Sequence, residues 1–144
     1  MSADLIASRQ TDVIDEFALF DDWMDKYEHL IELGKDVPAI DTGRKTDEHL
    51  IKGCQSRVWL AADAEADGTV HFTADSDAII TKGLVGLMVR VLSGAEARAI
   101  AEADLHFLYA IGLHQHLSPT RSNGLASMVK QMRLYAAALA ARQA

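Results

Sequence analysis

The sequence predicts an α+β fold in which a small antiparallel sheet of about three strands is covered by helices. Apolar residues recur at helical spacing near both ends of the chain, whereas two-residue alternation appears only near residues 58–73. Strands grouped between helical runs are typical of this fold class. The length of 144 residues suits one domain, residues 1–144, since domains usually have about 100 to 200 residues.

Two helices are predicted in the first third of the chain. The apolar residues of segment 13–20 recur at helical spacing behind Thr11, which we expect to cap the first helix. The second helix follows directly, with Asp21 or Asp22 as its N-cap and Gly34 near its end.

Alternating apolar and polar residues predict two antiparallel strands, around residues 58–60 and 70–73. Asp67-Gly68 between them favours a hairpin turn. A third, short strand is expected at residues 49–51, and the polar stretch 37–48 is expected to be irregular.

Helices return after the sheet. The capping-prone residues 75–77 precede an apolar helix that we expect to end near Gly94. Two shorter helices are predicted at residues 95–103 and 105–111. A long final helix is predicted to begin at Ser118-Pro119, because proline is favoured in the first helical turn.

Composition excludes several classes of protein. With 49% hydrophobic residues, 24% charged residues and two prolines, the chain is neither disordered nor collagen-like. Its one cysteine excludes a disulfide framework and any metal site made of cysteines alone. Residues 1–10 contain neither a signal-peptide core nor a membrane span, so we expect a cytoplasmic protein without a membrane partner.

The net charge of -7 is unevenly distributed. Residues 1–50 hold 13 acidic and 5 basic residues, whereas residues 51–144 hold 8 acidic and 9 basic residues. Proteins that bind nucleic acids usually present a basic face to the phosphates, so we expect no nucleic-acid partner. A protein partner suits this distribution better.

Cys54 is the candidate for chemistry. A lone cysteine is usually a small buried hydrophobe, but this one lies in the polar run Gly53-Cys54-Gln55-Ser56-Arg57 directly before a strand. Loops held by rigid elements often carry reactive groups. The thiolate is the nucleophile, and Lys52 and Arg57 either favour it or are solvated charges beside the loop.

One thiol limits the reactions that the chain supports. A dithiol oxidoreductase needs a resolving cysteine, so anything that Cys54 picks up must leave to another molecule, as in a carrier. A cysteine hydrolase needs a histidine in reach, and the six histidines form no recognisable motif with Cys54. His114 and His116 would bind a metal only with a third ligand, so we expect them to cap or pack and predict no metal site.

The segment 51–59, Ile-Lys-Gly-Cys-Gln-Ser-Arg-Val-Trp, closely resembles the cysteine loop of the SufE family. These proteins are sulfur acceptors that work with cysteine desulfurases in iron–sulfur cluster assembly. Further segments resemble blocks of the family in the same order, at 23–34, 75–84 and 116–125. Residues before 20 and those at 95–112 carry no signature of the family.

The resemblance implies a fold similar to that of SufE and of the scaffold IscU, and the function of a persulfide carrier. Cys54 would take sulfur from a SufS-type cysteine desulfurase, stimulate that enzyme and pass the sulfur to a SufBCD-type scaffold. Such a sulfurtransferase-like carrier needs no cofactor and has no turnover without the desulfurase. The alternatives are a CsdE-like acceptor for a different desulfurase pathway and a non-catalytic regulator of a desulfurase.

The resemblance also implies roles for residues around Cys54. Gly53, Gln55 and Ser56 would support the loop, with Gly53 allowing a backbone conformation that other residues resist. Asp77 and Arg121 fall in family motifs near the cysteine loop or the desulfurase contact. Asp77 has two competing roles, as a helix cap and in an ion pair with Arg121. By analogy, the loop shelters Cys54 in the free protein and extends it on docking.

Overall fold

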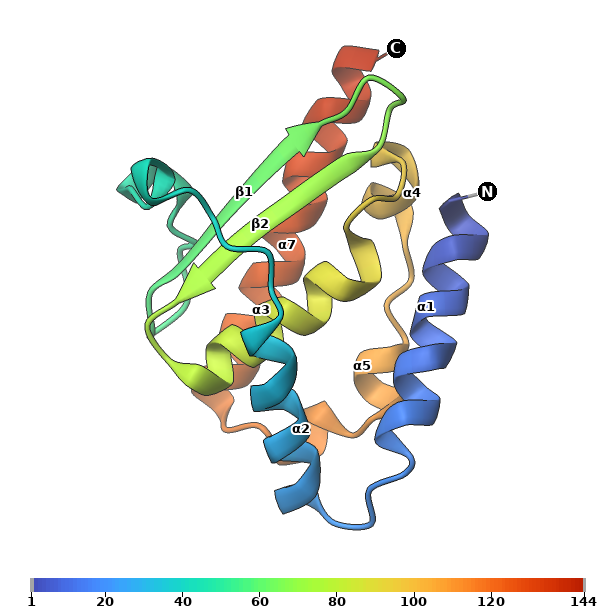
Figure 1. Ribbon diagram of the computed structural model, residues 1–144, viewed down its shortest axis with the longest axis vertical. Coiled ribbons are helices and arrows are strands. Elements are labelled where there is room, and N and C mark those ends of the chain that lie inside the picture. The colour runs from blue at the N-terminus through green and yellow to red at the C-terminus, as the bar shows by residue number, and fades with distance from the viewer. Residues whose placement is uncertain (1, 144) are drawn as a thin grey trace.

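A computed structural model describes residues 2–143 of the chain. Figure 1 shows a small sheet with helices around it. The elements are α1 (Ser2–Phe17), α2 (Trp23–Lys35), η1 (Thr42–Arg44), η2 (Asp47–His49), β1 (Val58–Ala64), β2 (Val70–Ser76), α3 (Ile79–Leu92), α4 (Ala97–Glu102), α5 (Phe107–Ala110), α6 (Leu113–His116) and α7 (Pro119–Gln143).

β1 and β2 form an antiparallel sheet in which Val58 pairs with Ser76 and Ala64 pairs with Val70. Helices α3 and α7 pack on one face of this sheet, and residues 37–50 cross the other side (Figure 1). The turn at Gly68 has φ +88°, which glycine adopts without strain. The predicted α+β class and the hairpin are confirmed.

The predicted third strand is wrong, because the described part of the chain contains a sheet of two strands. Leu50 forms an isolated antiparallel bridge with Trp59, and the Ile51 amide donates to the Val58 carbonyl over 2.8 Å. Pairing extends no further because the chain before Leu50 is the 3-10 helix η2 and the chain after Ile51 turns into the cysteine loop. These residues hold the base of that loop.

The predicted cap of the first helix is also wrong. Helix α1 begins at Ser2, so Thr11 lies within it and its hydroxyl donates to the Ala7 carbonyl. Ile6, Val13 and Phe17 form its buried stripe, which starts earlier than the periodicity near residue 13 indicated. The predicted cap of the second helix is confirmed, since Asp22 accepts a hydrogen bond from the Asp25 amide.

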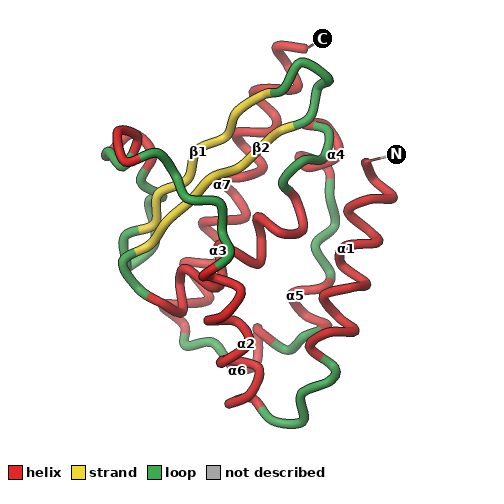
Figure 2. Tube along the Cα trace, in the orientation of Figure 1, coloured by secondary structure: helices red, strands yellow, loops and turns green. Residues whose placement is uncertain are grey.

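After α3 the chain forms the short helices α4, α5 and α6 and then the long helix α7, as Figure 2 shows. Helix α7 begins at Pro119 as predicted, and the Ser118 hydroxyl accepts a hydrogen bond from the Arg121 amide. Helix α3 lies at the centre, with Gly83 packed against the Leu30 carbonyl of α2, where a Cβ would clash. The N-terminal ends of α3 and α7 lie together beside residues 54–56, just before β1.

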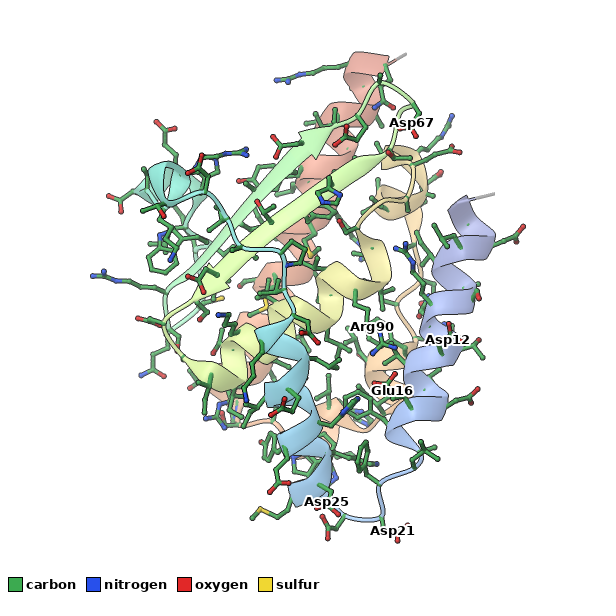
Figure 3. All side chains as sticks on the ribbon, viewed as in Figure 1. Asp12, Glu16, Asp21, Asp25, Asp67 and Arg90 are labelled. Carbon is green, nitrogen blue, oxygen red and sulfur yellow. The ribbon has the colours of Figure 1, made fainter. Side chains whose placement is uncertain are left out.

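An ion-pair network ties α1 to α2 and α3. The Arg90 guanidinium donates to both carboxylate oxygens of Glu16 (Figure 3). His29 Nε2 contacts the same carboxylate. Arg90 lowers the pKa of Glu16, chiefly through this hydrogen bond. No helix within residues 2–143 is both long and apolar enough to span a membrane.

Candidate functional site

Cys54 lies at the tip of a short loop, residues 52–57. The loop leaves the sheet after Ile51 and returns to it at Val58, where the Ile51 amide bonds to the Val58 carbonyl. Gly53 has φ +94°, a left-handed conformation that costs other residues about 1–2 kcal/mol. The sheet therefore holds both ends of the loop while its tip projects towards α7.

The tip closes over a cavity of about 450 Å³ between the loop, the start of α3 and the start of α7. We call it the Cys54 cavity. Its lining includes buried apolar residues such as Leu84 and Met128 and exposed polar residues such as Gln55 and Arg121. The lining residues are Cys54, Gln55, Ser56, Ala78, Ile79, Ile80, Thr81, Leu84, Ser118, Thr120, Arg121, Gly124 and Met128.

The Cys54 thiol is half-buried in this cavity. Its Sγ donates a hydrogen bond to the Gly124 carbonyl oxygen over 3.4 Å. Burial raises the pKa of the thiol above its ordinary value. Lys52 and Arg57 are exposed, which favours the alternative that they are solvated charges. In this position Cys54 is mainly a protonated thiol, protected from stray oxidants and weakly nucleophilic.

Two glycines lie where the loop meets α7, Gly53 in the loop and Gly124 in the helix. A Cβ built on Gly53 would collide with the Ser127 hydroxyl oxygen. A Cβ built on Gly124 would lie 3.5 Å from Sγ of Cys54, in ordinary van der Waals contact. Position 53 therefore requires glycine both for its backbone conformation and for its contact with Ser127. Position 124 has room for a methyl group beside the thiol.

Asp77 is positioned at the exit of the loop rather than at the cap of α3. Its carboxylate accepts a hydrogen bond from the Arg57 amide at 3.0 Å, and its own amide donates to the Arg57 carbonyl at 3.2 Å. The Ser76 hydroxyl donates to the same carbonyl at 2.8 Å. The N-cap of α3 is Ala78, which has no side-chain cap. The predicted cap role of Asp77 is therefore wrong, because the carboxylate is engaged by the loop.

Arg121 lines the rim of the Cys54 cavity from the first turn of α7 and is exposed. No ion pair joins it to Asp77, although both residues are described, so that alternative is not observed. Neither α3 nor α7 has an acidic residue in its first turn. Because helix N-termini carry partial positive charge, both helix starts and Arg121 contribute positive charge to the rim.

Gln55 is exposed and Ser56 is partly buried, and both line the Cys54 cavity. The structure thus brings together Cys54, its loop neighbours and Arg121, with Asp77 directly before the lining residue 78. Sequence reasoning missed Gly124, Met128 and Ser127, which lie in α7 about 70 positions after Cys54. Two signals pointed to Gly124: it lies in segment 116–125, which resembles the SufE family, and glycine is unfavourable inside a predicted helix.

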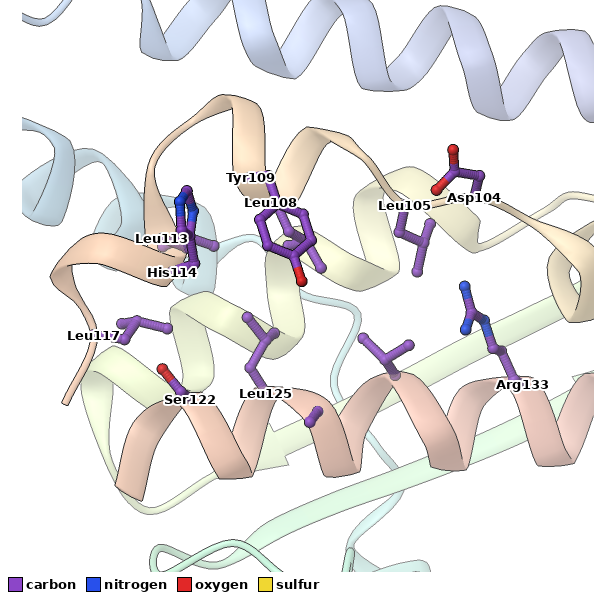
Figure 4. Close-up of a pocket in the computed structure, with 12 residues that line it drawn as sticks. Asp104, Leu105, Leu108, Tyr109, Leu113, His114, Leu117, Ser122, Leu125 and Arg133 are labelled. Carbon is purple, nitrogen blue, oxygen red and sulfur yellow. The ribbon is translucent and has the colours of Figure 1, made fainter. Parts of the chain in front are cut away.

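The remaining candidates lie outside this site. The ring of His116 stacks on Trp23 at 4.2 Å between centroids, and the ring of His114 lies 4.9 Å from that of Tyr109. Within residues 2–143, no group of three or more His, Cys, Asp or Glu residues is arranged to hold a metal ion. A separate groove of about 380 Å³, between α7 and the segment 104–117, is apolar and does not contain Cys54 (Figure 4).

Comparison with protein-family models identifies a match. The model of the SufE family, described as an Fe–S metabolism associated domain, matches residues 11–136. An uncharacterised SufE-like protein of Rhizobium etli is 42% identical over 125 residues, covering 84% of this chain and 84% of that protein. A similar protein of Rhizobium meliloti is 40% identical over 125 residues, covering 84% of this chain and 89% of that one.

A plant protein and a solved structure extend the comparison. SufE-like protein 1, chloroplastic/mitochondrial, of Arabidopsis thaliana is 42% identical over 107 residues, which is 74% of this chain and 29% of that protein. The solution structure of a hypothetical protein from Thermus thermophilus has a TM-score of 0.77 at 21% identity, covering 92% of this chain and 96% of that one. At this identity the likeness supports the fold alone.

Proposed function

This chain belongs to the SufE family, and from this premise we propose that Cys54 takes persulfide sulfur from a cysteine desulfurase and passes it to a scaffold for iron–sulfur cluster assembly. Membership of the family implies a sulfur-acceptor role with a cysteine desulfurase. The observation that carries the finer proposal is the position of the chain's one cysteine. It lies at the tip of a loop whose ends are held by the sheet and whose sulfur makes one weak hydrogen bond to α7.

The transfer is a thiol–persulfide exchange. The thiolate of Cys54 attacks the outer sulfur of a persulfide on the desulfurase, a new S–S bond forms, and the old S–S bond breaks. The desulfurase cysteine leaves as a thiolate and takes up the proton that Cys54 released. Electrons balance without an added oxidant or reductant, and the same exchange in the next step hands the sulfur to the scaffold.

Loop movement makes Cys54 available for this reaction. The thiol points into the Cys54 cavity, so an incoming persulfide reaches it only when the tip leaves α7. Gly53 provides a flexible position on one side, and Arg57 remains bonded to residues 76 and 77 on the other. Once the thiol leaves the cavity, the burial that raises its pKa is lost and the thiolate becomes more populated.

The deciding experiment mixes the chain with a desulfurase and free cysteine. Intact-mass measurement should find the mass of one additional sulfur on Cys54, and Cys54→Ser should acquire none. Stimulation of the desulfurase should also disappear in Cys54→Ser. Equal stimulation by both chains would contradict the carrier function and favour a non-catalytic regulator.

The partners are identified by the same measurement. Each desulfurase of the source cell is tested separately, which distinguishes a SufS-type partner from the CsdE-like alternative. Transfer onward is followed by mixing the persulfide-loaded chain with a SufBCD-type scaffold and measuring the loss of sulfur from Cys54. We retain the prediction of a cytoplasmic location without a cofactor. Cell fractionation tests the location, since the relative from Arabidopsis thaliana is named as a chloroplastic/mitochondrial protein.

A further inference from the structure

Ile79 is a large apolar side chain left exposed beside the nucleophile. It is the first residue of α3, 66% of it is exposed, and it lines the Cys54 cavity. Single exposed apolar residues are ordinary on protein surfaces. The other large hydrophobic residues that are exposed among the described ones lie outside this cavity: Leu5, Leu19, Met24, Tyr109 and Leu134.

Cations without ion-pair partners accompany Ile79. Lys52 and Arg57 flank Cys54 in the loop, Arg121 lines the cavity, and all three are exposed. None of them forms an ion pair with a described residue. We call Lys52, Cys54, Arg57, Ile79 and Arg121 the Cys54 face.

The two acidic residues just before α3, Asp75 and Asp77, are already engaged. The carboxylate of Asp77 accepts the Arg57 amide. The carboxylate of Asp75 lies between the ammonium groups of Lys45 and Lys82. Neither α3 nor α7 has an acidic residue in its first turn, so these two helix starts do not compensate the positive charge of this face.

The first two helices carry the opposite charge. Residues 1–35 hold 9 acidic and 3 basic residues, and α1 lies on the side of the molecule away from the start of β1 (Figure 1). An acidic partner would therefore be repelled by the N-terminal helices and attracted to the Cys54 face. Complementary charge of this kind orients an encounter and raises its rate.

We propose that the Cys54 face docks on an acidic surface of the cysteine desulfurase, with Ile79 inserted into an apolar socket and the cations against the surrounding carboxylates. An apolar centre with a charged rim is the usual organisation of a protein–protein interface. This inference rests on the proposed function, because it takes the sulfur donor as the partner. It identifies Ile79 as the main binding residue next to the thiol.

The test measures binding with Cys54→Ser throughout, so that sulfur transfer does not intervene. Ile79→Ser should weaken the Kd for the desulfurase about tenfold or more, the usual effect of losing a buried apolar side chain. Leu134→Ser is the matched control, since Leu134 is 53% exposed on α7 outside the cavity, and it should leave the Kd unchanged. Equal binding by Ile79→Ser and the control would overturn the proposal.

A second pair of variants tests the charges. Lys52→Glu should slow association and reduce its dependence on salt, whereas Lys130→Glu, an exposed lysine elsewhere on α7, should change neither. Equal slowing by both variants would show a general charge effect instead of a docking surface.

A third measurement separates this inference from the proposed function. With Cys54 intact and saturating desulfurase, Ile79→Ser should still acquire the persulfide to the full extent. Failure of the otherwise unmodified chain to acquire sulfur would refute the carrier function. Full sulfur acquisition together with unchanged affinity of Ile79→Ser would refute only the docking role.

Discussion

The thiol of Cys54 donates a hydrogen bond to the carbonyl oxygen of Gly124, 70 positions later in the chain. This contact joins the tip of the cysteine loop to the first turns of α7 and places the thiol over the Cys54 cavity. A sulfur hydrogen bond at 3.4 Å is weak, because the thiol is a poor donor. The loop is therefore closed mainly by packing, and its closure is sensitive to the shape of residue 124.

Substitutions of Gly124 should separate helix stability from loop closure. Gly124→Ala adds a methyl group at 3.5 Å from Sγ, an ordinary contact, and should stabilise the chain by up to about 1 kcal/mol because alanine favours helix. Gly124→Val adds methyl groups that reach the sulfur and should displace the loop. Urea unfolding and the rate of Cys54 alkylation check this. Alkylation should be faster in the valine variant and unchanged in the alanine variant, and equal rates in both would contradict control of the loop by residue 124.

Gly53→Ala should open the loop. The new Cβ is strained at φ +94° by about 1–2 kcal/mol and also meets Ser127. Faster alkylation of Cys54 should result. Gly43→Ala is the matched control, since Gly43 has no positive φ and a Cβ there meets open space apart from one oxygen at 3.9 Å. An alkylation rate in Gly53→Ala no higher than in Gly43→Ala would show that the closed loop does not need glycine.

Removal of the Asp77 carboxylate should loosen the exit of the loop. Asp77→Ala loses the acceptor of the Arg57 amide and should lower the free energy of local opening by about 1 kcal/mol, or roughly fivefold in amide exchange. Asp77→Asn keeps an acceptor oxygen and should retain most of the protection. Hydrogen exchange at the Arg57 amide measures this difference. Equal protection in the alanine variant and the unmodified chain would exclude a role of Asp77 in holding the loop.

Alkaline pH should favour the open loop. Burial raises the pKa of the Cys54 thiol in the folded chain, so the thiol holds its proton more tightly in the closed loop than when it is exposed. The stability that this proton gives to the closed loop is fully present below the pKa of the exposed thiol. It is lost as pH rises through the higher pKa of the folded chain. The rate of Cys54 alkylation should rise with pH, and the midpoint of this rise should lie at higher pH in the folded chain than in the urea-unfolded chain. Coincident midpoints would contradict burial of the thiol.

The Glu16–Arg90 pair should stabilise the fold only above acidic pH. Arg90 lowers the pKa of Glu16 in the folded chain, so this stability is present above the ordinary carboxyl pKa and is lost as pH falls through the lowered value. Glu16→Gln should therefore be less stable by at most about 1 kcal/mol at neutral pH, since the pair is partly exposed. The difference should vanish in acid. Glu32→Gln, which loses only a solvent-exposed pair with Lys35, is the control and should show no such difference in urea unfolding.

Much of the fold follows from local pattern. The hairpin, Asp22 as a cap and the start of α7 at Pro119 were all predicted, because each depends on residues within a few positions of one another. The start of α1 was not predicted, since its N-terminal turns are stabilised by packing rather than by a cap such as Thr11. The third strand was not formed because η2 and the cysteine loop leave Leu50 with a single bridge.

The sequence by itself determined which group acts, namely one thiol with no resolving partner, and how the charge is divided between the first third and the rest of the chain. Only the tertiary structure decided what surrounds that thiol: Gly124 and Ser127 from α7, Asp77 on the Arg57 backbone, and Ile79 exposed at the rim. The reason is physical. Composition and periodicity are local properties of the chain, whereas contacts between residues 20 to 70 positions apart exist only after the helices have packed on the sheet.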